Sequence, residues 1–387
     1  MTGGIARSRV GRGRLLAVES GAGALIAGVA LGGGARCALI AAGAVVIVVA
    51  LLRRGGTFAD RLLLDRLGRD ALAPASGTRR VPEDGGEEGL GLAHALIPVL
   101  DVTEFADRNL SPGAPGLGVL SDGRGCAAVL AFPGGTLPDL PAEQVRAWLA
   151  ADPARPAAAQ LVVEQFGLPP WDLQHGYGPT VAYRQLPGGP RPVAVRAWLV
   201  LRYEPFGASE AAERRGGGTA GARAATAAAT ARLRARLAAA GAPTTPLGAA
   251  DLRDLLRQLG DAAGEGRVSP TGWAGVDATH CSMAVRVASR AEWSRLLSGL
   301  AGCAAERVVT AATLTADGPR LRVVTAVRVV SMMAQHAVAE RERLLRAGVV
   351  PDLPTDQRAG LLATLPVAHP FRPLVETTGL GSPGALR

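Results

Sequence analysis

The chain contains no lysine, so all 42 of its basic residues are arginine. This excludes a GxxxxGK[ST] phosphate-binding loop, which needs a lysine. Aromatic residues make up only 4% of the 387 residues, so the core must be built from alanine, valine and leucine. The four cysteines lie far apart, with no CxxC and no Cys–His ligand spacing, which argues against a metal site.

Recognisable catalytic signatures are also missing. The sequence has no HExxH, no GxSxG, no kinase motif set and no pair of carboxylates with an evident role. The net charge of +9 has no basic stripe interleaved with aromatics and no helix-turn-helix or zinc-finger spacing beside it. We therefore expect no enzyme activity, cofactor, metal, nucleic-acid partner or small-molecule substrate.

Apolar residues are concentrated near the N-terminus, in two runs at about residues 15–31 (LLAVESGAGALIAGVAL) and 36–52 (RCALIAAGAVVIVVALL). A helix of about 20 apolar residues spans a bilayer core about 30 Å thick. Arg12 and Arg14 precede the pair, and Arg53 and Arg54 follow it. Because basic flanks stay in the cytoplasm, the pattern predicts a transmembrane hairpin in the inner (cytoplasmic) membrane, two-pass, with both termini cytoplasmic. A secretory signal followed by a buried helix is the alternative.

The first apolar run contains one ionisable residue, Glu19, and several glycines. An ionisable group in a membrane helix is often functional, although Glu19 is near the end that we expect to be cytoplasmic, where it can reach the interface. Gly21, Gly23 and Gly28 make one side of this helix small, which suits close packing on a partner helix.

Composition divides the rest of the chain. Residues 1–56 are the basic N-terminus and hairpin, and residues 57–72 (TFADRLLLDRLGRDAL) predict an amphipathic helix at the membrane surface. Residues 73–91 are rich in proline, glycine and acidic residues, as is typical of a linker. Residues 92–387 predict a cytoplasmic α/β domain, with halves at about 92–265 and 266–387.

The two halves of this domain repeat one order of elements, β-α-β-β-α. The predicted elements are 125–132, 141–151, 159–165, 193–203 and 219–240 in the first half, and 280–287, 290–300, 307–314, 321–331 and 334–347 in the second. Trp148 and Trp293 both fall in the first helix of their half. A strand hairpin in each half predicts a pseudo-twofold α/β (α+β) domain with a mixed or antiparallel sheet.

An insertion at residues 166–192 distinguishes the first half. It carries Trp171, His175, Tyr177 and Tyr183, and loops of this length are uncommon unless they bind something. Aromatic residues concentrate where proteins bind one another, so we favour a partner interface over a ligand pocket.

Two further segments contain residues that could take part in ligand binding or catalysis. Gly216, Gly217 and Gly218 precede a helix whose N-terminus could hold an anion, although a flexible linker is the simpler interpretation. His280 and Cys281 are adjacent, but neighbours on a strand point to opposite faces, so we expect a buried thiol and no catalytic pair.

The order of these features resembles EccE, a membrane component of the type VII (ESX) secretion system of actinobacteria. The resemblance is carried by the basic N-terminal hairpin, GRGCAAVLAF at residues 123–132, the glycine-to-helix segment from Gly216, Trp273 before the His280-Cys281-Ser282 strand, and LPTDQRAGLLATLP at residues 353–366. It covers nearly the whole chain and is weakest at residues 69–109. None of these patterns is catalytic.

The resemblance implies a structural subunit of the inner-membrane secretion complex, located beside EccB, EccC and EccD, with EccC as the ATPase motor. It also implies contact with membrane lipid. The alternative is a membrane-tethered enzyme or nucleotide-binding regulator of unknown substrate, which would use the twofold domain and the Gly216 loop.

Overall fold

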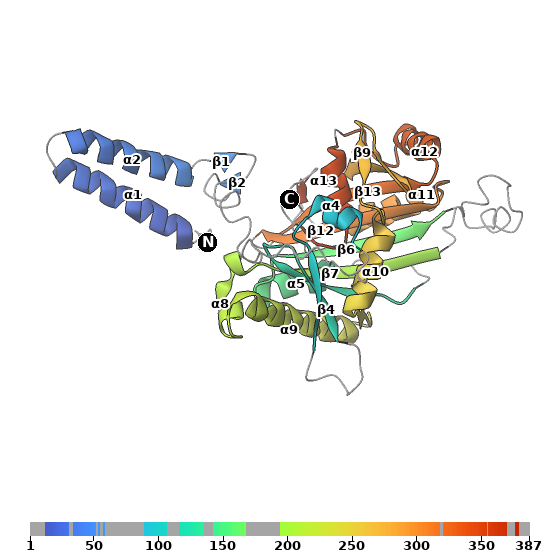
Figure 1. Ribbon diagram of the computed structural model, residues 1–387, viewed down its shortest axis with the longest axis horizontal. Coiled ribbons are helices and arrows are strands. Elements are labelled where there is room, and N and C mark those ends of the chain that lie inside the picture. Colours follow the sequence, from blue (N-terminus) through green and yellow to red (C-terminus); the bar gives the residue numbers. More distant parts are fainter. Residues whose placement is uncertain are drawn as a thin grey trace, which may run out of the picture. The chain divides into compact units, whose positions relative to one another are not determined.

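A computed structural model describes residues 12–30, 34–51, 53–54, 57–58, 89–106, 116–134, 142–167, 194–317, 320–353, 355–369 and 376–378 (Figure 1). The chain divides into two compact units, Met1–Ala71 and Leu72–Arg387.

The first unit is built around two helices that match the two apolar runs. They are α1 (Arg12–Ala30) and α2 (Gly34–Leu51), and they pack on each other as a hairpin. Two short strands follow, β1 (Arg53–Arg54) and β2 (Thr57–Phe58), which pair antiparallel. The amphipathic helix predicted at 57–72 therefore does not begin at Thr57, and residues 59–72 lie outside the described residues.

Glycines set the distance between α1 and α2. A Cβ added to Gly21 would lie 2.7 Å from Ile47 Cγ1, and one added to Gly43 would lie 2.6 Å from the carbonyl oxygen of Gly21. A Cβ on Gly28 would similarly meet Ile40, whereas one on Gly23 would meet nothing within 4 Å. The close packing predicted from the glycines is thus found at Gly21 and Gly28, whereas Gly23 makes no such contact with α2.

Within the described part of the chain, neither α1 nor α2 combines the length and apolarity that crossing a membrane requires. The predicted transmembrane hairpin is therefore not supported. α1 has 19 residues and includes Arg12, Arg14 and Glu19, while α2 has 18 and carries Arg36 in its first turn. These charges shorten each apolar stretch below the roughly 20 residues that a bilayer core needs.

The second unit is organised around one antiparallel sheet of twelve strands. Its main path runs β3-β4-β5-β7-β6-β12-β13-β11-β10-β9, with β8 on β5 and β14 on β13. The strands are β3 (Asp101–Phe105), β4 (Leu117–Ser121), β5 (Cys126–Ala131), β6 (Ala158–Phe166), β7 (Ala194–Tyr203), β8 (Thr245–Pro246), β9 (Gly266–Val268), β10 (Trp273–Gly275), β11 (Thr279–Val285), β12 (Arg307–Asp317), β13 (Arg320–Ser331) and β14 (Glu376–Thr378). The prediction of a mixed α/β architecture with a mostly antiparallel sheet is confirmed.

The strand order reveals how the two halves meet. The path β5-β7-β6 is followed by its mirror order, β12-β13-β11, so the first and second halves join along the β6–β12 ladder. Val162 lies opposite Ala311, and Val163 opposite Thr310, near the middle of that ladder. Each half has the order β-α-β-β-α, with α5 (Ala142–Ala151) and α9 (Gly218–Ala239) in the first and α11 (Arg290–Leu300) and α12 (Ala334–Arg346) in the second.

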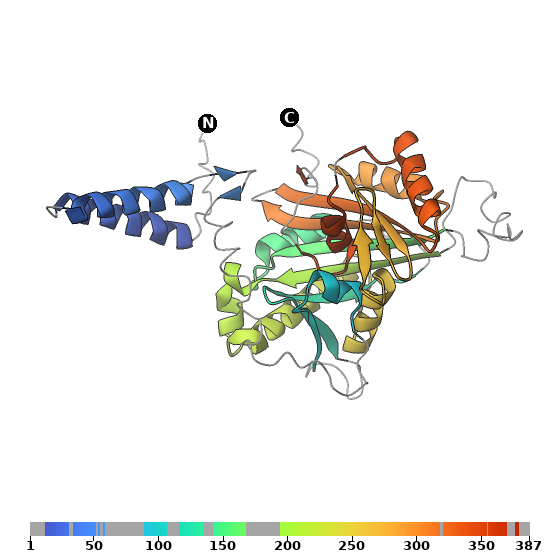
Figure 2. The same ribbon diagram turned by 45° about the horizontal axis from the view of Figure 1, so that its top comes forward.

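These four helices, with α8 (Ser209–Glu213), bury the larger core against one face of the sheet. Trp148 of α5 and Trp293 of α11 are both buried there, at corresponding places in the two halves. The long helix α9 contacts β3, β4, β5 and β7 (Figures 1 and 2). Its many alanines let it lie close to the sheet, because short side chains allow close backbone approach.

The opposite face of the sheet is covered by α4 (Leu92–Leu96), α10 (Ala249–Leu259) and α13 (Gln357–Thr364). Helix α10 is strongly amphipathic, with Leu252, Leu255, Leu256 and Leu259 buried. Its first turn accepts a carboxylate from another element, because Ala249 N donates to Glu104 Oε2 at 2.6 Å. An acidic group is favourable at a helix N-terminus, so this contact fixes α10 against β3.

Side-chain amides attach the C-terminal segment, residues 355–369, to the same face. Gln160 Nε2 donates to the carbonyl of Ala363, and its Oε1 accepts from Ala368 N, both at 2.8 Å. Gln357 pairs with both the amide and the carbonyl of Ser282, at 2.9 and 3.0 Å. Gln357 therefore replaces a neighbouring strand at the part of β11 that β10 does not reach.

Replacing Gln357 by alanine leaves the amide and carbonyl of Ser282 buried without this partner. We expect Gln357→Ala to lower the free energy of unfolding by about 1–3 kcal/mol. Urea unfolding followed by tryptophan fluorescence measures this in the second unit, which holds all five tryptophans. Gln335→Ala, at an exposed position of α12, is the matched control and should change stability little. Equal effects of the two variants would contradict the assigned role of Gln357.

Candidate functional site

The residues predicted as an interface, Trp171, His175, Tyr177 and Tyr183, lie outside the described residues, so their prediction stays open. Of the predicted membrane-flanking residues, Arg12 and Arg14 lie in α1, and Arg53 and Arg54 form β1.

The described residues do show what surrounds the two ends of the inserted segment. Phe166 ends β6, and the β7 residue Arg196 stacks its guanidinium over the Phe166 ring at 5.0 Å and over the Trp198 ring at 5.4 Å. Arg196 also forms a 2.7 Å ion pair with the buried Glu164. Cation–π stacking and the ion pair together hold this strand end rigidly.

Two exposed apolar side chains lie at the same end of the sheet. Thr279 at the start of β11 pairs with Ser331 at the end of β13. Val276 lies in the turn before Thr279, and Met332 directly follows Ser331; each exposes 65% of its surface. This sheet end therefore presents apolar surface beside the strands that carry the inserted segment. We call Val276, Met332 and Phe166 the sheet-end patch.

Behind this patch, arginines from the sheet bind the C-terminal end of α10. Arg307 donates to the carbonyls of Gln258 and Gly260. Arg328, which is completely buried, donates to the carbonyl of Leu259 at 2.5 Å. The last carbonyls of a helix carry partial negative charge, so they partly neutralise both guanidinium groups.

Asp261, directly after this helix end, completes a buried polar cluster with His280 and Arg328. Arg328 Nη1 lies 3.2 Å from His280 Nδ1, and His280 Nε2 lies 3.9 Å from Asp261 Oδ2. Because guanidinium can only donate, Nδ1 must accept, and the proton of neutral His280 is then on Nε2, facing Asp261. The backbone amides of Ala263, Asp277 and Ala278 donate to the same carboxylate.

Burial determines the protonation of this cluster. Burial, reinforced by the charges of Arg328 and Arg307, lowers the pKa of His280 to about 4, although Asp261 acts in the opposite direction. Burial also lowers the pKa of Arg328 to about 9. His280 is therefore neutral at pH 7.

The cluster has a catalytic appearance but no access for a substrate. Asp261, His280 and Arg328 are all buried. Ser282, two residues after His280 along β11 and on the same face of the strand, is covered by α13, since a Cβ on Gly360 would lie 2.4 Å from Ser282 Cβ. We conclude that these residues connect α10 to the sheet and do not form a catalytic triad.

The adjacent Cys281 is buried against the other core, as predicted, and does not pair with His280. Burial raises the pKa of the Cys281 thiol to about 11 and that of the Cys126 thiol likewise to about 11, so neither is a ready nucleophile at pH 7. Among the described residues, no group of three or more His, Cys, Asp or Glu side chains could hold a metal ion.

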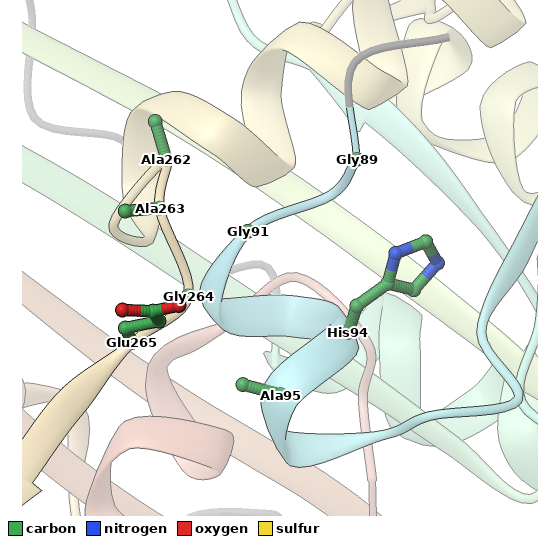
Figure 3. A pocket seen from close by; sticks show the side chains of 8 residues that line it. All are labelled: Gly89, Gly91, His94, Ala95, Ala262, Ala263, Gly264 and Glu265. Carbon is green, nitrogen blue, oxygen red and sulfur yellow. The ribbon is translucent and has the colours of Figure 1, made fainter. Parts of the chain in front are cut away.

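A shallow depression of about 450 Å³ lies between α4 and the turn after α10 (Figure 3). His94 lines it, but its Nδ1 accepts from Leu90 N and its Nε2 bonds to the carbonyl of Leu100. Figure 3 shows His94 and Glu265 pointing away from each other. Gly91 and Gly264, which also line it, are in close backbone contact with each other, and the other lining residues are Gly89, Ala95, Ala262, Ala263 and Glu265. Both nitrogens of His94 are occupied, so the depression offers little with which to bind a ligand.

The glycines before α9 show the expected geometry without a further sign of a ligand. Gly216, Gly217 and Gly218 have φ values of 99°, 71° and 57°, which favour glycine, and α9 begins at Gly218 without a side-chain cap. A helix N-terminus can hold an anion. The described residues around it supply no additional group dedicated to one.

Comparison with known proteins finds one family whose model matches part of the chain. Residues 192–285 match the family model of EccE. That family is described as "Putative type VII ESX secretion system translocon, EccE". The resemblance to EccE predicted from the sequence is confirmed over this segment, which is 94 of the 387 residues. A search of curated proteins found no match.

The EccE match begins just before β7 and runs through α9 and α10 to the end of β11. It thus contains Arg196, Asp261 and His280, but not Arg328. The Asp261–His280–Arg328 cluster is not predictable from local sequence patterns, because its members are widely separated in the chain. The only available signal was the position of Asp261 immediately after the predicted end of an amphipathic helix.

Protonation of His280 should destabilise the fold. The pKa of its imidazole is about 6.5 in the unfolded chain and about 4 in the folded one, so the unfolded state binds more protons between these values. Stability should therefore fall by up to about 3 kcal/mol as the pH drops from 6.5 to 4. Urea unfolding across this range measures the effect.

The variant His280→Gln removes this titration and should flatten the profile between pH 6.5 and 4. Below pH 4 both proteins should still lose stability, because the pKa of Asp122 is about 2: burial raises it, and the charge of Arg202 more than offsets this. An unchanged slope between pH 6.5 and 4 in the variant would show that another group is responsible.

Proposed function

We propose that the chain is a structural subunit of a type VII ESX secretion complex, in which it supports assembly or stability and does not catalyse a reaction. The observation that carries the proposal is the EccE match at residues 192–285. The polar residues of the matched segment that could have been catalytic, Asp261 and His280, are buried and engaged in fixing α10. Association with other translocon subunits follows from the family, and we propose EccB, EccC and EccD as those partners.

We further propose a location at the cytoplasmic membrane, with the hairpin contacting lipid and both termini cytoplasmic. Two features support it. Ile26 and Val29 on α1, and Val45 and Val48 on α2, are largely exposed, which is costly in water when repeated over a whole hairpin. The arginines at positions 12, 14, 53 and 54 suit anionic headgroups, which contribute about 1 kcal/mol for each basic residue near the surface.

For the surface that meets the partners, we propose the sheet-end patch together with the predicted interface residues Trp171, His175, Tyr177 and Tyr183. The patch supports this because Val276 and Met332 are exposed and lie beside the paired ends of β11 and β13. Aromatic and methionine side chains are enriched in the buried centres of interfaces.

The alternative is a membrane-tethered enzyme or nucleotide-binding regulator, motivated by the open glycine loop at Gly216. Isothermal titration of the full chain in mild detergent with nucleoside triphosphates discriminates between the two. Saturable heat would favour the alternative, and none is expected from the structural role.

The direct test is native electrophoresis of membranes solubilised in mild detergent, with a tagged chain and mass spectrometry of its band. We expect a large assembly that contains other type VII subunits. Changing Val276 and Met332 to aspartate should release most of the chain from this band, because an interface core does not tolerate charge. Migration of the wild-type chain alone would contradict the proposal.

The control for the double aspartate variant is Phe206→Asp. Phe206 is also exposed, in the 3₁₀ turn η1 (Pro205–Gly207), but it follows Tyr203 at the opposite end of β7 from Ala194. This variant should leave the large assembly intact. Equal losses from both variants would mean that the sheet-end patch has no special role.

The membrane topology of the chain can be tested separately with reporter fusions. A reporter fused after Arg387 should show a cytoplasmic C-terminus, because the basic flanks of the hairpin remain on that side. A second reporter inserted between residues 33 and 34 then determines whether the hairpin crosses the membrane or enters it from one side. An external C-terminus would contradict the proposed location.

A further inference from the structure

The chain segment that follows α13, residues 365–369, lies against the sheet without forming a strand. We call it the strap. Val367 and Ala368 in the strap are completely buried. Side chains of the sheet hold its backbone, because Gln160 Oε1 of β6 accepts from Ala368 N at 2.8 Å and Arg202 Nη1 of β7 donates to the carbonyl of Val367 at 3.3 Å. The strap therefore attaches the C-terminal end of α13 to strands of the first half.

The bound strap includes a backbone conformation that alanine disfavours. Ala368 has a φ of 48°, which is in the left-handed region where a Cβ is crowded by the backbone. A strained residue of this kind persists only where the surrounding contacts over-determine it. The bound state of the strap therefore depends on the contacts that flank Ala368, which are those of Val367 and those of His369.

His369, at the end of the strap, lies beside a buried carboxylate in the turn between β4 and β5. Its Nε2 is 4.0 Å from Oδ2 of Asp122, and the two side chains expose 15% and 1% of their surface. Arg202 Nη1 also binds Asp122 Oδ2, at 2.7 Å. Burial raises the pKa of Asp122, but Arg202 and, to a smaller extent, the charge of His369 lower it to about 2. Asp122 is therefore ionised at neutral pH, with its charge close to the imidazole.

Other charged groups around Asp122 act on His369 as well. Arg202 and Arg124 disfavour a positive charge there, and Arg124 does so from a half-exposed position where solvent screens it. The charge of Arg202 is offset by two carboxylates, because its Nε lies 2.7 Å from Glu204 Oε1 in addition to its contact with Asp122. Asp122 is within ion-pair distance of His369, so its attraction dominates and favours the imidazolium form.

We propose that the strap is a pH-sensitive latch, in which protonated His369 pairs with Asp122 and holds residues 365–369 on the sheet. In an open strap His369 is in water, where an imidazole is half-protonated near pH 6.5. The closed strap keeps this proton to higher pH and so binds more protons than the open one. The stabilisation is therefore complete below about pH 6.5 and is lost as the pH rises above it. Opening uncovers the apolar surface of the sheet that Val367 and Ala368 cover.

Hydrogen exchange of the full chain in mild detergent, followed by mass spectrometry, tests the latch. The amides of Val367 and Ala368 donate to Leu365 O and Gln160 Oε1, so they exchange when the strap opens. After correction for intrinsic exchange, their opening constant should rise about tenfold from pH 6 to pH 8, which corresponds to a difference of one unit in the pH of half-protonation. Peptides from α9, which has no histidine or acidic residue, are the internal reference.

Two substitutions at position 369 separate charge from shape. His369→Gln is polar but cannot become charged, so its strap should open at every pH as readily as that of the wild-type chain at pH 8. His369→Arg is always charged, so its strap should remain closed at pH 8, with the opening constant of the wild-type chain at pH 6. His336→Gln, on α12, is the matched control and should keep the wild-type pH dependence.

Three results would overturn the latch. The first is equal opening of the wild-type strap at pH 6 and pH 8. The second is a pH dependence that His369→Gln retains, because another group would then be responsible. The third is a strap that opens as readily in His369→Arg as in His369→Gln, because the charge would then have no effect. The inference does not depend on the proposed function, and none of these results bears on the assembly.

Discussion

The polar contacts at the C-terminal end of α10 hold together the two halves of the second unit. Its last carbonyls receive Arg307 from β12 and Arg328 from β13, while Glu164 from β6 pairs with Arg307 and Arg196. β6 belongs to the first half and β12 to the second, so one buried carboxylate links the halves across their shared ladder. A buried guanidinium without partners costs several kcal/mol, and the carbonyls at this end of α10 supply partners to Arg328 and Arg307. The polar groups thus select one arrangement where apolar packing alone would accept several.

Local patterns were enough to predict the repeated elements. Helix α11 has the predicted bounds of 290–300, and β13 follows the alternation in Arg322-Val323-Val324-Thr325-Ala326. What local patterns did not reveal was the mirror order of the strands, because register between β6 and β12 depends on residues about 150 positions apart. They also missed the cluster of Asp261, His280 and Arg328. Arginine is rarely buried, so a sequence-based assignment places Arg328 at the surface.

In the α1–α2 hairpin, too, local sequence predicted the helices but not which residues of one helix contact the other. Apolar content predicted two helices and their close contact, but not which glycines make it. Gly21 faces α2 because Gly43 lies opposite and allows the approach, whereas Gly23, two residues later, is turned by about 200° and faces outward.

The distribution of satisfied and unsatisfied groups favours a protein that works through its surfaces. Inside the second unit, polar side chains such as Gln160, Gln357 and Arg202 are occupied by backbone and carboxylate partners, which leaves them no role toward a substrate. Outside, apolar residues remain exposed at the sheet-end patch and along α1. Exposed apolar surface is costly for an isolated chain and useful for one that is completed by neighbours. These exposed residues therefore support the proposed role as a subunit of a larger assembly, and the EccE match at residues 192–285 supports the same proposal.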